Sequence, residues 1–153
     1  KKKHINTILQ NYSKSKYFNE YKFFFQNLYS KNYNSLSDMN IFFIKEICKK
    51  ININCEFYES DNLNTDGAKS EKILNICKKL KVKEYVSVLG SKEYLENDKK
   101  ILDKNEIQII YFNYMIEKYQ TFYKNFYPKL SIVDILFNCG HNSKKIIIQG
   151  IKI

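Results

Sequence analysis

Two short loops in the middle of the sequence carry residue types that suit an anion. The first contains Gly67, Lys69 and Glu71, and the second runs from Gly90 to Tyr94. Each combines a glycine, which lets the backbone approach a ligand closely, with a lysine in the first turn of the helix expected to follow. The N–H groups at such a helix N-terminus attract a phosphate or carboxylate. The alternative is that the loops only cap their helices.

Two further residues are candidates for proton transfer. Asp134 is the one carboxylate in the otherwise apolar segment 130–140. It has two interpretations: a capping box with Ser131, or a general base or substrate acceptor that faces a pocket. His4 is the second candidate, with a position at the surface or core edge as the alternative.

The predicted site combines these residues with a few others. The catalytic candidates are Asp134 and His4, and the substrate-binding candidates are Gly67, Lys69, Glu71, Ser87, Gly90, Ser91, Lys92, Tyr94, Gln120 and Ser131. The cysteines form no CxxC pair and the histidines have no partner at ligand spacing, so no structural metal is expected.

Helices are expected in the first third of the chain, where apolar residues recur every three to four positions. This spacing predicts helices over residues 5–12 and 17–28, followed by an Asn/Ser-rich loop. Ser37 is the expected N-cap of a third helix that ends near residue 52.

In the middle of the chain the spacing of the apolar residues changes, and the new pattern predicts the order β-α-β-α-β. Strands are expected at 53–60, 85–89 and 107–112, with helices at 69–80 and 91–104. Strands that alternate with helices of this length pair in parallel through right-handed crossovers. Ligands bind beyond the carboxyl ends of such strands, so we expect the two glycine-containing loops to share one rim.

The tail is expected to be helical again. Residues 119–126 are aromatic-rich, and a helix from Ser131 to Cys139 begins at Ser131 as N-cap and ends at Gly140. Residues 146–148 fit a last strand or a helical turn. The predicted fold is therefore an α/β layered domain with a small, mainly parallel sheet flanked by helices and with helical N- and C-terminal segments. With no repeat or low-complexity linker, residues 1–153 are expected to form a single domain.

Composition narrows the function classes. The 153 residues are 44% hydrophobic, which supplies a core, and 26 Lys+Arg against 16 Asp+Glu give a net charge of +10. All of these cations are lysines, whereas readers of nucleic acid usually use arginine for bidentate contacts, so nucleic acid is a disfavoured partner. No apolar run approaches the roughly 20 residues that span a bilayer. The scattered cysteines suit reduced thiols in the cytoplasm.

The order of several motifs resembles the WbqC-like family. The most specific block is LSIVDILFNCG at 130–140; weaker matches are Lys2–His4 before a helix to Tyr12, residues 67–77, Tyr85–Ser87 with Gly90 and Tyr94–Leu95, and Tyr119–Gln120. Members of that family begin with a QPxYLPW-like segment and an acidic, tryptophan-containing stretch that this sequence lacks. The resemblance therefore implies the C-terminal portion of a WbqC-like protein.

The resemblance also implies a bacterial cytoplasmic protein of surface-polysaccharide synthesis, such as that of O-antigen. We expect an enzyme, a transferase of group-transfer type, that acts on a nucleotide-activated sugar or another glycan precursor. The expected partner is an anionic small molecule such as a nucleotide sugar, and no cofactor is assigned. The alternative is a non-catalytic binding or scaffolding module of the glycan machinery.

Overall fold

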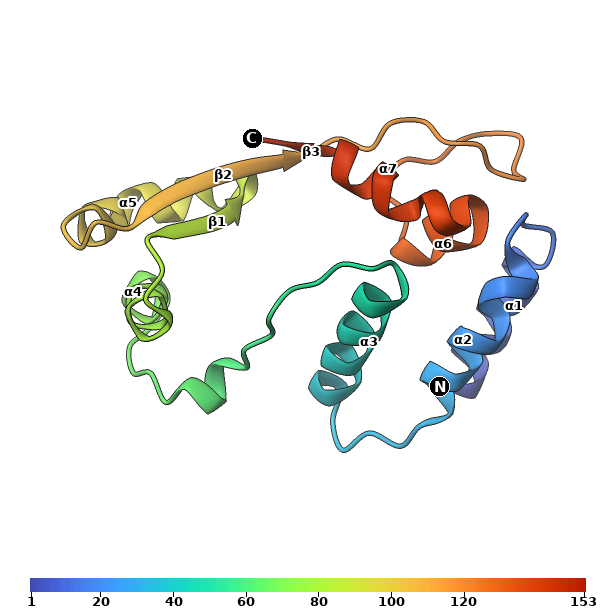
Figure 1. Ribbon diagram of the computed structural model, residues 1–153, viewed down its shortest axis with the longest axis horizontal. Helices are drawn as coiled ribbons and strands as arrows, with labels where there is room; N and C mark the ends of the chain where they lie inside the picture. The colour runs from blue at the N-terminus through green and yellow to red at the C-terminus, as the bar shows by residue number, and fades with distance from the viewer. The chain divides into compact units, whose positions relative to one another are not determined.

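A computed structural model describes residues 1–96 and 99–153 of the chain. Its elements fall into two compact units (Figure 1). Unit 1 comprises residues 1–55 and 116–150, and unit 2 comprises residues 56–115 and 151–153. The α/β class with helical ends is confirmed. The expectation of a single domain stays a prediction.

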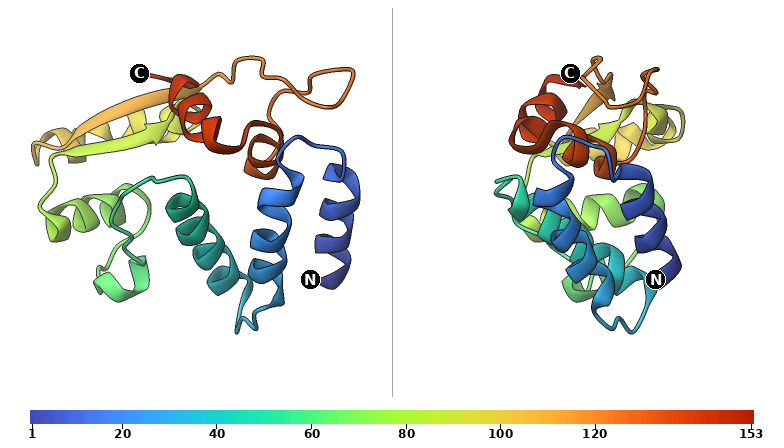
Figure 2. Two further views of the ribbon diagram at one scale, coloured as in Figure 1. Left: turned by 45° about the vertical axis from the view of Figure 1, so that its right-hand side comes forward. Right: turned by 90° about the vertical axis from the view of Figure 1, so that its right-hand side faces the viewer.

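Unit 1 is helical. Its elements are α1 (Lys2–Tyr12), α2 (Phe18–Ser30), α3 (Leu36–Lys50), α6 (Ile132–Cys139), the 3-10 turn η3 (Gly140–Asn142) and α7 (Ser143–Gln149). The helices predicted over 5–12, 17–28 and 131–139 are confirmed, and α1 and α2 lie side by side (Figure 2). The N-cap of α3 is Ser35 and not Ser37, because the Ser35 hydroxyl accepts the Asp38 N–H at 3.0 Å.

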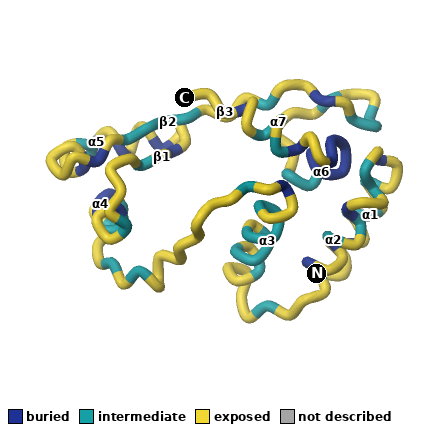
Figure 3. The backbone as a smooth tube through the Cα atoms, viewed as in Figure 1, coloured by how far each residue is buried: buried dark blue, intermediate teal, exposed yellow. Residues whose placement is uncertain are grey.

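The core of unit 1 forms around α6, which is buried along almost its whole length (Figure 3). Phe137 is at its centre and stacks on Tyr12 and Phe25, with ring centroids 5.0 and 5.2 Å away. Ser131 caps the start of the helix and Gly140 follows its last residue, as the sequence predicts. The apolar face of this helix therefore fixes where its polar residues point.

Unit 2 contains the sheet. Its elements are the 3-10 turn η1 (Ser60–Leu63), α4 (Lys69–Leu80), β1 (Glu84–Val88), the 3-10 turn η2 (Leu89–Ser91), α5 (Lys92–Asp103), β2 (Gln108–Tyr114) and β3 (Ile151–Lys152). The strand order is β1-β2-β3. β1 and β2 pair in parallel, and β3 adds a short antiparallel pairing at the end of β2.

The two long helices of unit 2 cover one face of the parallel pair. Tyr85 and Ile109 are register partners, so their side chains leave the sheet on the same face. They pack in one apolar cluster with Leu74 of α4 and Leu102 of α5. This packing supports the predicted helix–strand order from residue 69 onward.

The strand predicted at 53–60 does not form. All of these residues are described, and none of them pairs with a strand; η1 starts at Ser60 instead. Ile53 packs in the core of unit 1, whereas residues 54–60 are exposed. The β-favourable residues thus have no sheet edge to join, and the predicted row of three parallel strands is reduced to the β1–β2 pair.

In the tail, the structure overturns one prediction and decides between the two alternatives of another. Residues 119–126, all described, form an irregular segment and not a helix. Its backbone bonds to a side chain, since the Phe122 N–H donates to Asn138 Oδ1 at 3.3 Å. Its aromatic residues pack on α6, since Tyr119 and Phe126 form one apolar cluster with Ile135 and Cys139 of that helix. Residues 146–148, left open between a strand and a helical turn, belong to α7.

Candidate functional site

The buried carboxylate of Asp134 organises a polar cluster in unit 1. Its exposed fraction is 0%. The Tyr119 hydroxyl donates to Oδ2 at 2.5 Å, and Asn138 Nδ2 donates to Oδ1 at 3.2 Å and to the Asp134 carbonyl at 2.9 Å. The carboxylate points to these partners and not to the Ser131 backbone, so the capping-box interpretation is wrong. Ser131 itself caps through its hydroxyl, which accepts the Val133 N–H at 3.3 Å.

The tyrosines around Asp134 are held in their protonated form. Burial and the hydrogen bond with Asp134 raise the pKa of Tyr119 above its usual range. Burial and the charge of Asp134, with a hydrogen bond between the two side chains, act in the same direction on the pKa of Tyr12. At neutral pH both phenols are therefore hydrogen-bond donors and not bases.

Two cavities of about 170 Å³ each adjoin this cluster. They share Lys16, Gln120 and Asn138. The first is also lined by Tyr17, Tyr119, Cys139, Asn142 and Ile146, and the second by Lys14, Thr121 and Phe122. Each cavity is smaller than the roughly 300–1,000 Å³ typical of a drug-sized ligand. A phosphate group or one sugar ring matches them better than a whole nucleotide sugar.

Cys139 borders the first cavity, and its thiol is protected from ionisation. Burial, followed by the charge of Asp134, raises its pKa to about 11. A thiol with such a pKa is protonated at neutral pH, and the thiolate is the nucleophilic form. We therefore assign no nucleophilic role to Cys139.

The structure brings together only some of the site residues predicted in unit 1. Gln120 lines both cavities and Asp134 lies in the adjoining cluster, so the structure brings these two into one region. Ser131 is exposed at the start of α6. His4 is exposed on α1. It lies eight residues, about 12 Å along the helix, from Tyr12 in the cluster.

The first predicted loop of unit 2 leads into α4 without a side-chain cap. Ala68 precedes the helix and makes no capping bond with its side chain. Gly67 has a φ of +96°, a conformation that favours glycine. Lys69 and Glu71 are exposed in the first turn of α4. Their proposed contacts with an anion stay a prediction.

The second loop contains a buried pair of hydroxyls. The Ser91 hydroxyl donates to the Val88 carbonyl at 2.7 Å, and its oxygen is 2.7 Å from that of Ser87. Since Ser91 uses its proton on Val88, Ser87 is the donor of the second bond. Gly90, Lys92 and Tyr94 are exposed, and Lys92 Nζ is 5.9 Å from the centre of the Tyr111 ring. The contact of Lys92 with an anion stays a prediction.

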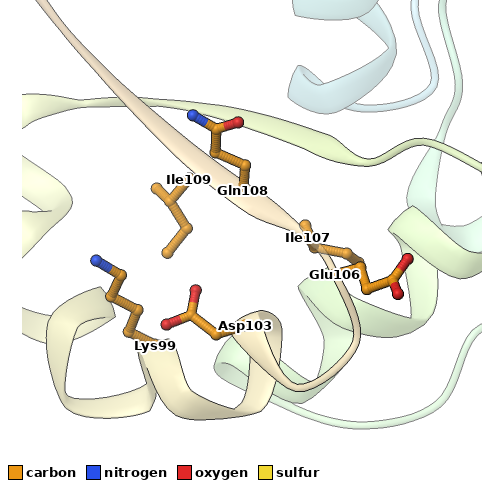
Figure 4. A pocket seen from close by; sticks show the side chains of 6 residues that line it. All are labelled: Lys99, Asp103, Glu106, Ile107, Gln108 and Ile109. Carbon is orange, nitrogen blue, oxygen red and sulfur yellow. The ribbon is translucent and has the colours of Figure 1, made fainter.

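A larger, open cavity of about 490 Å³ lies at the start of β2. It is lined by Lys99, Asp103, Glu106, Ile107, Gln108 and Ile109. Figure 4 shows Lys99 and Asp103 on the same side, toward Ile109, with Glu106 turned away. Glu106 pairs instead with Lys83 at 2.9 Å, on the solvent-exposed surface. The cavity is at the amino end of β2, whereas ligands of parallel sheets bind at the carboxyl ends.

Sequence reasoning missed several residues of the unit 1 site. These are Tyr12, Lys14, Lys16, Tyr119 and Asn138. One signal was available, because Asn138 follows Asp134 by four residues and the two share a helix face. The sequence offered no such signal for Lys14 and Lys16. They lie in the turn between α1 and α2 and reach the site only through the packing of unit 1.

The fold and site define an α/β protein with a parallel βαβ unit and with a buried aspartate, bonded to Tyr119 and Asn138, beside two small cavities. Residues 1–146 match the WbqC-like protein family, and the chain belongs to it. The uncharacterized protein Rv1507c of Mycobacterium tuberculosis is 28% identical over 141 residues, which cover 91% of this chain and 60% of that relative. The chain thus spans 60% of the length of this relative. No solved structure matches the chain.

Two other kinds of site do not occur in the part of the chain that the structure describes. Within the described residues, no helix is long and apolar enough to cross a bilayer. In the same part of the chain, no three His, Cys, Asp or Glu side chains gather in a way that would hold a metal ion.

Replacing Tyr119 with phenylalanine tests the cluster directly. We expect Tyr119→Phe to lower the free energy of unfolding by about 1.5–3 kcal/mol, because a buried carboxylate oxygen loses a charge-assisted donor. Tyr127→Phe is the matched control, since Tyr127 is 56% exposed and should change stability by less than about 0.5 kcal/mol. Urea unfolding followed by circular dichroism measures both. Equal effects of the two substitutions would contradict the assignment.

Proposed function

We propose that this chain is part of a group-transfer enzyme of surface-glycan biosynthesis that acts on a nucleotide-activated sugar or glycan precursor. The proposal is supported most by the two cavities that share Lys16, Gln120 and Asn138 beside the buried Asp134. Ammonium groups neutralise phosphate charge, and amides bond to sugar hydroxyls. The cytoplasm is the proposed location, since sugar nucleotides are found there.

Asp134 has a positioning role in this proposal. Its carboxylate is buried and already bonded to Tyr119 and Asn138, so it does not reach a substrate directly. It accepts the hydrogen bond of the Tyr119 hydroxyl and so fixes this side chain, which lines the first cavity, with its oxygen free to accept a bond from a ligand. His4 remains the other catalytic candidate, as a residue that could handle a proton. Lys69 and Lys92, with the backbone near Gly67 and Gly90, form the proposed phosphate-binding region of unit 2.

Binding of sugar nucleotides tests the proposal. We expect at least one of a panel of UDP-, CDP- and GDP-sugars to raise the melting temperature of the chain, because a ligand that binds the folded state stabilises it. Lys16→Ala should weaken this binding by roughly 10- to 100-fold, the loss of one charged contact worth about 1.5–3 kcal/mol. Lys49→Ala is the control, since Lys49 is exposed on α3 and makes no part of either cavity.

Calorimetric titration measures each affinity. No binding of any sugar nucleotide, or equal weakening by the two lysine substitutions, would refute the proposed site. Lys92→Ala tests the region of unit 2 in the same titration. Its failure to change the affinity would remove that region from the proposal and leave the cavities of unit 1.

A non-catalytic module is the second candidate function. The observation in its favour is that both carboxylate oxygens of Asp134 have partners within the protein, as in a purely structural cluster. It predicts that Asp134→Asn and Lys92→Ala leave glycan synthesis intact in cells. Loss of the glycan with a folded variant, as judged by circular dichroism, would rule it out.

A further inference from the structure

The C-terminal end of α3 closes with a tight turn. Asn52 has a φ of 56°, in the left-handed region. The Ile53 N–H donates to the Cys48 carbonyl at 2.8 Å, and the Asn52 N–H donates to the Lys49 carbonyl at 3.2 Å. This pair of bonds is that of the Schellman motif. It holds the backbone of Ile53 against the carbonyl of Cys48, two residues before Cys55.

The turn is held by two contacts within unit 1. Ile53 packs in the apolar core, together with Ile47 and Ile51 of the same region. On the polar side, Lys144 Nζ of α7 donates to the Asn52 carbonyl. The position of the segment that follows is thus set by tertiary packing and not by the helix alone.

Two cysteines meet at this turn. Cys48 is half-buried on α3, and Cys55, two residues after Ile53, is exposed; both thiols are free. Burial raises the pKa of the Cys48 thiol, and the neighbouring Cys55 thiol acts in the same direction. Cys77 and Cys139 are both buried. Accessibility and a close partner thiol therefore coincide at Cys55.

We propose that Cys48 and Cys55 are a redox-active dithiol that a small disulfide oxidant, such as glutathione disulfide, converts into an intramolecular disulfide. The proposal depends on the turn and on the contact of the two thiols, and it is independent of the proposed function. Adjacent thiols on a preorganised turn form a disulfide with little loss of conformational freedom.

The reaction has two exchange steps. The exposed Cys55 thiolate attacks one sulfur of glutathione disulfide, whose S–S bond breaks and releases one glutathione thiolate. Cys48 then loses its proton and attacks the Cys55 sulfur of the mixed disulfide, which releases the second glutathione. The two cysteine thiols are oxidised by two electrons, glutathione disulfide is reduced, and the two protons go to the released glutathione molecules.

The disulfide would act at one of the three points where the chain passes between the two units. Cys55 is the last residue of the first stretch of unit 1, and Glu56 is the first residue of unit 2. A bond from Cys55 to α3 fixes the point at which this connection leaves unit 1. Oxidation would therefore restrict the freedom of the connecting segment without touching the Asp134 cluster.

Equilibration of the full chain with mixtures of reduced and oxidised glutathione tests the proposal. Intact mass spectrometry should show a species lighter by two hydrogens, without bound glutathione. Cys48→Ser should instead accumulate a glutathione adduct, and only at a ratio of oxidised to reduced glutathione roughly tenfold higher, because it lacks the high effective concentration of the partner thiol. Cys77→Ser is the control and should behave as the unchanged chain.

A peptide map identifies the bond. Trypsin cleaves after Lys49 and Lys50, between the two cysteines, so only the disulfide joins their peptides. The expected product is this cross-linked pair. A glutathione adduct on Cys55 of the unchanged chain at the same ratio as in Cys48→Ser, or a cross-link between other cysteines, would overturn the proposal.

Discussion

Replacing Gly140 with alanine is expected to lower the free energy of unfolding by about 2–6 kcal/mol, the sum of backbone strain and overpacking. Gly140 follows α6 with a φ of 55° and a ψ of −124°, a combination that residues with a Cβ rarely adopt. A Cβ built on Gly140 would also overlap the ring of Tyr17. The backbone of Tyr17 is held in place, since its N–H donates to the Phe137 carbonyl at 3.0 Å.

Gly90→Ala is the matched control for this substitution. A Cβ on Gly90 meets nothing within 4 Å, and its φ is not positive. We expect a change within about 0.5 kcal/mol. Urea unfolding followed by far-ultraviolet circular dichroism compares the two variants. A midpoint for Gly140→Ala equal to that of Gly90→Ala would mean that the turn after α6 tolerates a side chain.

Phe137→Ala is expected to lower the free energy of unfolding by about 3–5 kcal/mol, the usual effect of removing a buried aromatic ring. Phe137 is 0% exposed and is stacked with Phe18, at 5.9 Å, as well as with Tyr12 and Phe25. Its removal leaves a cavity between α1, α2 and α6. Because α6 carries Asp134 and Asn138, the polar cluster should loosen with the core.

Phe23→Ala separates loss of packing from loss of an aromatic residue. Phe23 belongs to α2 but is 62% exposed, so its truncation should change stability by less than about 0.5 kcal/mol. The same urea titration, with near-ultraviolet circular dichroism to follow the tyrosines of unit 1, measures both. Similar losses for Phe23→Ala and Phe137→Ala would contradict the placement of Phe137 at the centre of the core.

Gly140→Ala and Phe137→Ala should also affect the candidate site of unit 1. Asp134 and Asn138 are four residues apart, and the ends of their helix are fixed by Ser131 and Gly140. Strain at Gly140 or a void at Phe137 should therefore weaken ligand binding in the cavities of unit 1 along with stability. Tyr119→Phe disturbs the cluster and leaves Phe137 and Gly140 in place.

The local sequence pattern was sufficient to predict those elements whose formation depends mainly on their own residues. The spacing of apolar residues predicted α1, α2 and α4 to within a few residues, since one face of each helix is buried. The same reasoning failed for 53–60, because a strand requires a partner and this segment has none. It failed for 119–126 as well, where aromatic residues at helical spacing instead pack on α6 from an irregular backbone.

The sequence by itself determined the α/β class, the family resemblance and the capping of α6 by Ser131 and Gly140, because periodicity and caps act within a few residues. Only the tertiary structure decided that Asp134 bonds to Tyr119, 15 residues before it, and that Lys16 and Gln120 line common cavities. These contacts join segments that are distant in the chain. Their partners are selected by the packing of α1, α2 and α6 around Phe137, and no local pattern encodes that packing.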